Sequence, residues 1–355
     1  MSMKIGILTS GGDCAGLNAV ICAFEKAITA MDPKVDLYGI LGGYTGLINR
    51  EYKPLKHEDF SNIFNLGGTI LGTSRQPYKK LIQDEGRQKV TAMKENYHKM
   101  NLDALIILGG QGTHKTAALL SSEGLNVIAL PKTIDNDLWG TDFTFGFHSA
   151  VNVATECIDR VQTTAASHRR AMVVEIMGNK VGWLTLYAGI GGGADVILIP
   201  EIPYDIDKVI KAVESAKKQK GYCIIATAEG AMDKEEATLA KKERYQKRGE
   251  RGEVTASNRI AKAIEEKLGI ETRVIVPGHI QRGGAPSAYD RVLCSQVGAY
   301  AAKLAIERKY GVTVALKGDK VIANNLADIA GKTNVVPPKH ELIKAAKDIG
   351  ISFGD

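Results

Sequence analysis

Short apolar runs alternate along this chain with longer segments whose apolar positions have helical spacing. Apolar runs of this length without strict alternation are typical of strands buried on both faces, as in parallel sheets. We predict strands at residues 4–9, 36–41, 104–108, 126–130, 171–177, 196–199, 222–227 and 272–276. We predict helices at residues 15–31, from about 114, and at 149–167, 205–218, 256–268, 287–309 and 339–348, with a hairpin across 317–320. Alternating strands and helices over 355 residues indicate an α/β protein with two interleaved domains and a cleft between them.

The composition is that of a globular protein, with 44% hydrophobic and 24% charged residues. It contains no apolar stretch of 18 residues and no charged-then-apolar leader, so we expect a cytoplasmic protein without a membrane span. Five scattered cysteines without a CxxC pair indicate free thiols. The net charge of +6 comes from lysines without interleaved aromatic residues, which favours anionic metabolites over nucleic acid as partners.

Glycine-rich turns follow several predicted strands. Residues 10–16, 42–46 and 109–113 each contain two or more glycines, and the glycine-rich stretch 66–75 ends on Arg75. Between a strand and a helix, such turns let backbone N–H groups approach an anion near the positive end of the helix dipole. The spacing fits neither a dinucleotide fingerprint nor a Walker A loop, so a tight turn without a function is the alternative for each turn taken singly.

Two aspartates two residues apart, Asp135 and Asp137, follow the strand predicted at 126–130, with Lys132 and Thr133 just before them. Open α/β sheets bind ligands at this edge. One carboxylate can take a proton from an attacking hydroxyl, while the other carboxylate and a cation manage charge around a phosphate. The alternative is a solvated strand-to-helix turn capped by an aspartate.

Cations gather in the second half of the chain, at residues 168–170 and at Arg273, His279 and Arg282. They suit a second phosphorylated ligand. Together with the glycine turns and the aspartate pair, they indicate phosphoryl transfer to a phosphorylated acceptor. The seven histidines show no zinc spacing, and no G-x-S-x-G elbow is present, which argues against zinc hydrolysis and acyl transfer.

Over nearly its whole length the chain resembles the phosphofructokinase family. The resemblance is carried by LTSGGDCAGLNAVI, GGTILGTSR, LGGQGT, PKTIDND, MGNKVGW, the Glu229 segment, GHIQRGG and AYDR. It implies two interleaved α/β domains with the active site in the cleft between them. We expect residues 1–145 plus about 279–311 to form the phosphoryl-donor domain, and 146–278 plus about 312–355 the sugar-phosphate domain. The implied reaction, a step of glycolysis, is Mg²⁺-dependent transfer to the 1-hydroxyl of fructose 6-phosphate, giving fructose 1,6-bisphosphate.

The resemblance also implies roles for individual residues. Asp135 resembles the general base, with Asp137, Thr133 and Arg75 as further catalytic groups and Asp137 as the expected Mg²⁺ ligand. The expected donor contacts are Gly12, Arg75, Gly112, Thr113 and Lys132, and the expected sugar-phosphate contacts are Thr133, Asp135, Arg170, Met177, Gly178, Glu229, Arg273, His279 and Arg282. Counterparts of Arg170 and Arg273 reach across from a neighbouring subunit, so a homotetramer or homodimer with shared active sites is implied.

Three positions depart from the family pattern. Gln111 stands where an aspartate is usual, and a neutral amide is a poor Mg²⁺ ligand, so the metal must depend more on phosphates, water and the aspartate pair. Asn179 replaces a usual arginine, a loss for which the adjacent Lys180 could compensate, and His148 replaces a usual aspartate. The alternatives are therefore a kinase of a related sugar phosphate such as sedoheptulose 7-phosphate, or a non-catalytic metabolite-binding subunit.

The donor markers conflict. Gly112 leaves room for a nucleotide where pyrophosphate users carry an aspartate, whereas Lys132 is typical of pyrophosphate users. A nucleotide cannot easily avoid an aspartate at position 112, whereas the long side chain of Lys132 can move aside. We therefore expect ATP as the donor, with pyrophosphate as the alternative. Cys22, Lys26 and Gln162 stand where members of the family regulated by ADP and phosphoenolpyruvate carry arginines, so we expect no such regulation.

Overall fold

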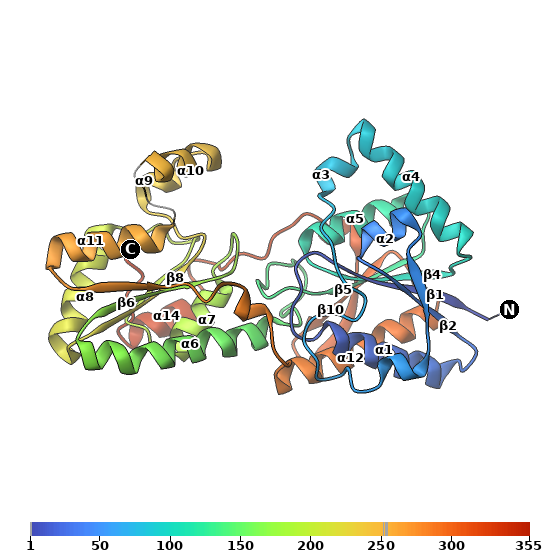
Figure 1. Ribbon diagram of the computed structural model, residues 1–355, viewed down its shortest axis with the longest axis horizontal. Coiled ribbons are helices and arrows are strands. Elements are labelled where there is room, and N and C mark those ends of the chain that lie inside the picture. The colour runs from blue at the N-terminus through green and yellow to red at the C-terminus, as the bar shows by residue number, and fades with distance from the viewer. Residues whose placement is uncertain (1, 251, 253–254) are drawn as a thin grey trace. The chain divides into compact units, whose positions relative to one another are not determined.

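The computed structural model describes residues 2–250, 252 and 255–355. The chain divides into two compact units (Figure 1). Unit 1 comprises Met1–Ser149 and Arg282–Asn334, and unit 2 comprises Ala150–Gln281 and Val335–Asp355. The expected placement of residues 312–334 in the second domain is wrong, because their two strands belong to the sheet of unit 1.

Unit 1 is built on a seven-stranded sheet in the order β11-β10-β5-β4-β1-β2-β3. Its central strands are parallel, and only the edge strands β3 and β11 run antiparallel to their neighbours. The predicted hairpin is confirmed, because β10 and β11 pair from Val312↔Asn325 to Lys317↔Lys320. The strands are β1 (Lys4–Ser10), β2 (Asp36–Ile40), β3 (Tyr52–Leu55), β4 (Ala104–Gly109), β5 (Val127–Pro131), β10 (Val312–Lys317) and β11 (Lys320–Asn325).

Helices cover both faces of this sheet. Helices α1 and α12 pack together on one face, and α2, α4 and α5 lie on the other (Figure 1). Alternate residues of β4 show the division, because Leu105 and Ile107 belong to the core that also contains Tyr97 of α4 and Leu120 of α5. The helices are α1 (Leu17–Met31), α2 (Tyr44–Asn49), the 3₁₀ turn η1 (His57–Phe60), α3 (Tyr78–Leu81), α4 (Asp84–Lys99), α5 (Gln111–Ser122), α12 (Ala288–Ile306) and α13 (Leu326–Ile329).

Unit 2 has a four-stranded, all-parallel sheet in the order β7-β8-β6-β9, formed by β6 (Ala171–Ile176), β7 (Val196–Leu198), β8 (Cys223–Ala228) and β9 (Thr272–Ile275). Helices α8 and α11 cover one face, where Val213 and Ile260 pack on Val173 and Ile225 of the strands. Helix α7 lies against β7 and β8. The helices are α6 (Phe147–His168, whose first residues belong to unit 1), α7 (Trp183–Gly191), α8 (Ile206–Lys220), α9 (Lys234–Ala237), α10 (Lys241–Glu250), α11 (Ala256–Leu268), η2 (Gly278–Arg282) and α14 (Glu341–Asp348).

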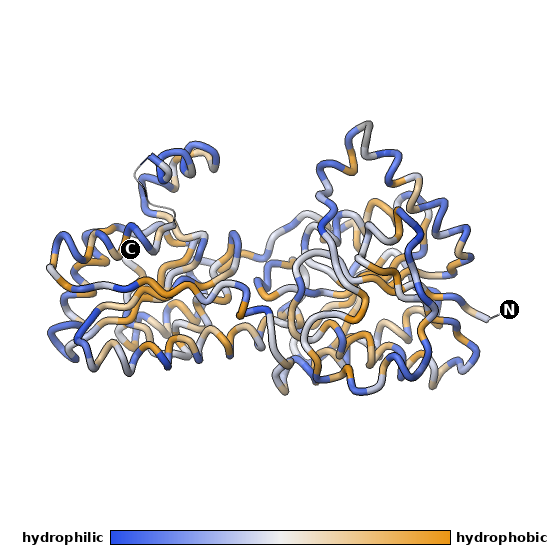
Figure 2. The backbone as a smooth tube through the Cα atoms, viewed as in Figure 1, coloured by the Kyte–Doolittle hydropathy of each residue, from blue (hydrophilic) through white to orange (hydrophobic). Residues whose placement is uncertain are grey.

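In each unit the apolar residues concentrate in the strands, and the polar residues on the outer sides of the helices (Figure 2). The predicted fold class, two mainly parallel sheets flanked by helices, is confirmed. Among the described residues, no helix is both long enough and apolar enough to span a bilayer.

Candidate active site

The strand order of unit 1 reverses between β1 and β4, since β2 lies beyond β1 on one side and β5 beyond β4 on the other. Open α/β sheets bind ligands outside the carboxyl ends of strands at such a switch point. The register aligns these ends, with Ser10 opposite Gly109 and Gly109 opposite Pro131. Three motifs predicted separately, at residues 10–16, 109–113 and 131–137, therefore start from one edge of one sheet.

The turn after β1 is held by the segment that ends at Arg75. The Gly11 amide donates to the Ser74 carbonyl at 3.0 Å, and the Thr73 hydroxyl donates to the Gly11 carbonyl at 2.7 Å. Gly11 has a φ of +89°, which favours glycine. A Cβ added at Gly12 would lie 2.8 Å from Nη1 of Arg282, so only glycine lets this guanidinium come so close. The exposed Arg75 is thereby placed beside the turn.

Helix α5 begins at Gln111 rather than near His114, so Gln111, Gly112 and Thr113 form its first turn. Its N-cap residue, Gly110, makes no side-chain cap, and the first turn contains no acidic residue. The first N–H groups of a helix have no partner within the helix and attract anions. Gly112 is exposed, and a Cβ there would meet nothing within 4 Å. The turn therefore has the chemistry of a phosphate site and room for a bulky donor.

Lys132 is buried, with 4% of its surface exposed, and its ammonium donates to the Gly12 carbonyl. Its Nζ lies 3.5 Å from the position of a Cβ at Gly11. Burial lowers the pKa of Lys132, an effect that the nearby Asp135 carboxylate opposes. The ammonium is therefore placed inside the turn where donor phosphates are expected to bind.

The loop after β5 is tightly hydrogen-bonded. The Thr133 hydroxyl accepts from the Asp135 amide at 3.1 Å, and the Thr144 hydroxyl donates to the Thr133 carbonyl at 2.7 Å. Asn136 adopts a left-handed φ of +53°, and its Oδ1 accepts from the Thr144 amide at 2.9 Å. Asp135 and Asp137, on either side of it, are only half-buried. The loop therefore presents two carboxylates from a fixed backbone, as general base chemistry requires.

Among the described residues, no three His, Cys, Asp or Glu side chains gather into a metal cage. Mg²⁺ rarely uses one, because it keeps several waters and binds through one or two carboxylates plus substrate phosphates. The half-buried aspartate pair beside a phosphate-binding helix end fits that requirement. Gln111 does not add a ligand of the usual kind, since its amide nitrogen donates to the Lys332 carbonyl and the Thr333 hydroxyl.

In unit 2, the carboxyl ends of β6 and β8 are aligned, with Ile176 opposite Ala228. Glu229, just after β8, accepts from the Gly178 amide at 3.2 Å and the Asn179 amide at 2.6 Å through Oε1. The Met177 amide donates to Oε1 of Gln281 at 3.3 Å. The fold thus brings Met177, Gly178 and Glu229 together.

Arg170 and Arg273 converge on one carboxylate. Arg170 Nε donates to Glu271 Oε2 at 2.5 Å, and Arg273 Nη2 donates to Glu271 Oε1. The side chain of Arg273 is 54% exposed and that of Arg170 is 27% exposed, so both remain accessible in part. His279 is exposed on η2, and Arg282, the last residue of η2, is counted in unit 1 beside Gly12. The expected acceptor contacts are therefore divided between the units.

Comparison with known proteins agrees with this geometry. The family model described as phosphofructokinase matches residues 4–305. The chain belongs to the phosphofructokinase family. It is 51% identical to the ATP-dependent 6-phosphofructokinase of Spirochaeta thermophila over 99% of this chain and 97% of that relative. It is also 42% identical to the pyrophosphate–fructose 6-phosphate 1-phosphotransferase of Amycolatopsis methanolica, over 95% and 97% of the two chains. Phosphofructokinase from Saccharomyces cerevisiae superposes with a TM-score of 0.77 at 32% identity, over 92% of this chain and 45% of that chain.

Two positions that depart from the phosphofructokinase pattern have distinct surroundings. His148 packs its ring against Phe143 and Tyr289, at centroid distances of 4.7 and 3.9 Å, and burial lowers the pKa of its imidazole. Asn179, in a left-handed conformation with φ +56°, lies on the wall of a cavity of about 660 Å³. Charged residues share that wall: Glu175, Lys180, Glu229, Arg244 and Arg248. Lys180 is therefore near Glu229, as compensation for the missing arginine would require.

The charge density of residues 234–253 predicts a solvated segment, and most of its described residues are exposed, but one ion pair within it is buried. Arg248 and Glu236 are buried, with 6% and 4% exposed, and Arg248 donates to both Glu236 oxygens at 2.7 Å. Position 253, at its end, lies outside the described residues. Sequence reasoning also missed Gln281 and Glu271. Gln281 stands inside the GHIQR motif, which could have flagged it, whereas nothing local marks Glu271 as the partner of two arginines.

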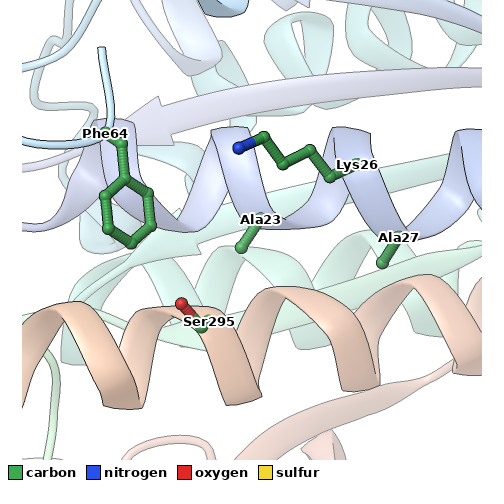
Figure 3. Close-up of a pocket in the computed structure, with 5 residues that line it drawn as sticks. All are labelled: Ala23, Lys26, Ala27, Phe64 and Ser295. Atoms are coloured by element: carbon green, nitrogen blue, oxygen red, sulfur yellow. The ribbon is translucent and has the colours of Figure 1, made fainter. Parts of the chain in front are cut away.

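Two of the three positions expected to lack effector arginines, Cys22 and Lys26, lie on α1 of unit 1. Cys22 and Lys26 line a cavity of about 250 Å³ together with Glu25, a buried acid in contact with His57. A neighbouring cavity of about 450 Å³ lies between α1 and α12, and Figure 3 shows Phe64 and Ser295 bordering it. Gln162, in unit 2, donates to the Gly192 carbonyl. One lysine beside a buried carboxylate is a poor site for a phosphorylated effector.

Proposed function

We propose that this protein is an ATP-dependent 6-phosphofructokinase, an enzyme of glycolysis that transfers the terminal phosphoryl group of ATP to the 1-hydroxyl of fructose 6-phosphate. The observation that carries the proposal is the convergence of the Gly12 turn, the start of α5 and the Asp135 loop at the switch point of one sheet. The relative from Spirochaeta thermophila, named as such an enzyme, supports it.

In the proposed mechanism the donor phosphates bind the amides of the Gly12 turn and the first turn of α5, where Thr113 is buried and its hydroxyl donates to the Ser10 carbonyl. Arg75 and Lys132 balance the phosphate charge, one from the exposed side and one from the buried side. These fixed groups position the terminal phosphoryl group for transfer, which depends chiefly on positioning and electrostatics.

Asp135 acts as the general base for the sugar hydroxyl, and the Thr133 hydroxyl, which accepts the Asp135 amide, fixes its backbone. Asp137 would hold Mg²⁺, which when bound neutralises charge on the phosphates. Glu229, fixed by two amides at one oxygen, can accept a sugar hydroxyl with the other. Met177, Gly178, His279 and Arg282 complete the acceptor contacts.

We further propose that Arg170 and Arg273 bind the sugar phosphate of a neighbouring subunit in a homodimer or homotetramer in the cytoplasm. Their shared partner Glu271 neutralises part of the charge of the two guanidinium groups and orients them until a phosphate takes its place. Light scattering across a concentration series tests the assembly, and a monomer with full activity would contradict it. An Arg273→Ala variant should then raise the KM for fructose 6-phosphate about tenfold or more, because a charge-assisted bond contributes roughly 1.5–3 kcal/mol.

A steady-state assay that crosses ATP and pyrophosphate with fructose 6-phosphate and sedoheptulose 7-phosphate tests the activity. We expect the highest kcat/KM with Mg-ATP and fructose 6-phosphate, and a loss of about 10²–10⁴ in kcat for Asp135→Asn. The second candidate is a pyrophosphate-dependent enzyme, which the buried Lys132 and the Amycolatopsis methanolica relative support. Turnover with pyrophosphate alone would favour it. Absence of turnover with every pair would instead identify a binding subunit.

A further inference from the structure

A segment near the end of unit 1, Lys332–Asn334, runs along the outside of the Asp135 loop. Thr333 forms an isolated antiparallel bridge with Leu138. The Asn334 amide donates to the Asp137 carbonyl at 2.9 Å, and the Asn334 side chain donates through Nδ2 to the Asn136 carbonyl at 3.0 Å. One asparagine therefore holds two consecutive carbonyls of the loop that carries both aspartates.

The same segment is fastened to the start of α5. Gln111, the first residue of that helix, donates through Nε2 to the Lys332 carbonyl at 3.2 Å and to the Thr333 hydroxyl. Both are contacts of the amide nitrogen, and a carboxylate of similar size could not make the bond to the Lys332 carbonyl, although it could accept from the Thr333 hydroxyl. Gln111 thus connects the donor end of the sheet to the segment that holds the aspartate loop.

Asn334 acts where the loop most needs an external bond. Asn136 has φ +53°, a conformation that an L-residue occupies at a cost unless its surroundings hold it. On the inner side its own side chain holds the Thr144 amide and the Asp142 carbonyl, with Nδ2 donating to the latter at 3.1 Å. On the outer side Asn334 fixes the peptide planes that follow Asn136 and Asp137. A rotation of either plane would turn the neighbouring carboxylate.

We propose that Gln111 and Asn334 are positioning residues for the Asp135/Asp137 pair, with Gln111 anchoring Lys332–Asn334 and Asn334 fixing the two peptide groups that flank Asp137. The proposal rests on the proposed function, since it assigns these residues to the same transfer step. It gives Gln111 a role as a hydrogen-bond donor, opposite to that of a metal ligand. The two roles make opposite predictions for a carboxylate at position 111.

The decisive variant is Gln111→Glu, which keeps the length of the side chain and replaces both amide hydrogens by an acceptor facing the Lys332 carbonyl. We expect kcat to fall at least tenfold, with the KM for fructose 6-phosphate and the Mg²⁺ concentration for half-maximal rate within twofold of the parent. Asn334→Ala should give a similar loss, and the double variant should be little worse than either, because both break one connection. Gln219→Glu, on the exposed surface of α8, is the matched control and should match the parent.

A role as metal ligand predicts instead that Gln111→Glu lowers the Mg²⁺ requirement or raises kcat, and either result would overturn the proposal. Thr333→Val removes one acceptor at nearly constant volume, so it serves if Gln111→Glu fails to fold, and it should reduce kcat about threefold. A Thr333→Val protein with parental kcat would count against the anchor.

Amide hydrogen exchange on the full-length protein separates the proposal from the proposed function. In Gln111→Glu, the Asn334 amide and residues 133–138 should exchange at least tenfold faster than in the parent, while strand β6 stays unchanged. This comparison needs no turnover, so a parent inactive with ATP and fructose 6-phosphate would sink the proposed function and leave the exchange result to decide on the anchor. Equal exchange rates in the variant and the parent would refute the anchoring role of Gln111.

Discussion

Gly112→Asp should make the protein more stable and nearly abolish its use of ATP. Gly112 is the second residue of α5, is exposed, and is absent from the glycines with positive φ. A Cβ there would meet no atom within 4 Å. The Cβ of a substituted residue therefore fits without moving a neighbour.

The expected gain in stability has two sources. A glycine within a helix costs roughly 0.5–1 kcal/mol relative to a residue with a side chain, chiefly through the entropy of the unfolded chain. A carboxylate in the first turn gains about 0.3–1 kcal/mol from the helix dipole, and this turn contains no acid in the parent. The free energy of unfolding should therefore rise by about 1–2 kcal/mol.

The expected loss of activity comes from the same charge. A carboxylate about 5 Å from a donor phosphate, at an effective dielectric constant of about 20, costs about 3 kcal/mol. That corresponds to a fall of about 200-fold in kcat/KM for ATP. Steric overlap with a nucleotide would add to this figure.

Urea unfolding and steady-state kinetics with ATP and with pyrophosphate, on the same preparations, measure both effects. Gly112→Ala is the control: it should gain only the entropic part of the stability, and its kcat/KM for ATP should remain far above that of the aspartate variant. A Gly112→Asp protein that uses ATP within threefold of the parent would show that the donor does not bind at the start of α5. A less stable variant would refute the helix-end geometry.

Three further outcomes follow from buried polar groups. Burial lowers the pKa of His114 to about 4. As the pH falls from 6.5 to 4, the unfolded chain therefore binds a proton that the folded chain does not, and the free energy of unfolding should fall by up to about 3 kcal/mol. In a urea-unfolding series against pH, His114→Gln should flatten this slope. Asp290, fully buried, accepts from the Gly146 and Ser149 amides at 3.0 and 2.7 Å, so Asp290→Ala should cost about 3 kcal/mol or more, against less than about 0.5 for the exposed Asp319→Asn. Lys132→Met, which keeps the buried stem, should lower kcat/KM at least tenfold more for pyrophosphate than for ATP in parallel assays, because ATP has further contacts. An equal loss would mean that the ammonium serves both donors alike.

The local sequence pattern was sufficient to predict elements that are determined by their own residues. The strands at 4–9, 104–108 and 126–130 are apolar runs buried on both faces, and they occur within a residue or two of their predicted ends. The start of α5 was placed three residues late, because glycines at 110 and 112 suggest a turn, although an exposed glycine in a first helical turn is compatible with a helix. The interpretation of glycines depends on their position in the element.

Long-range pairing was where prediction failed. The hairpin across 317–320 was recognised from its turn, but its partner is β5, more than 180 residues earlier, through Val312↔Ile128 and Thr313↔Ala129. Nothing in the hairpin specifies which sheet it joins. The same holds for Glu236 and Arg248, which the charge pattern places in solvent and the fold pairs in the interior. Burial of a charge depends on a partner, and the sequence does not state the partner.

The candidate site shows both cases at once. Its candidate reacting groups follow strands, and because parallel strands end at one edge, motifs that are far apart in sequence start from the same edge of the sheet. The contacts that hold them join residues far apart in sequence: Asn334 lies 198 residues after Asn136, and Gln111 reaches Thr333 across 222 residues. A substitution at Gln111 can be compensated only by residues that it touches in space. The departures from a family pattern are therefore best judged by their contacts, and at Gln111 those contacts lead to the segment that holds the aspartate loop, which makes the effect of a carboxylate there the sharpest test of the site.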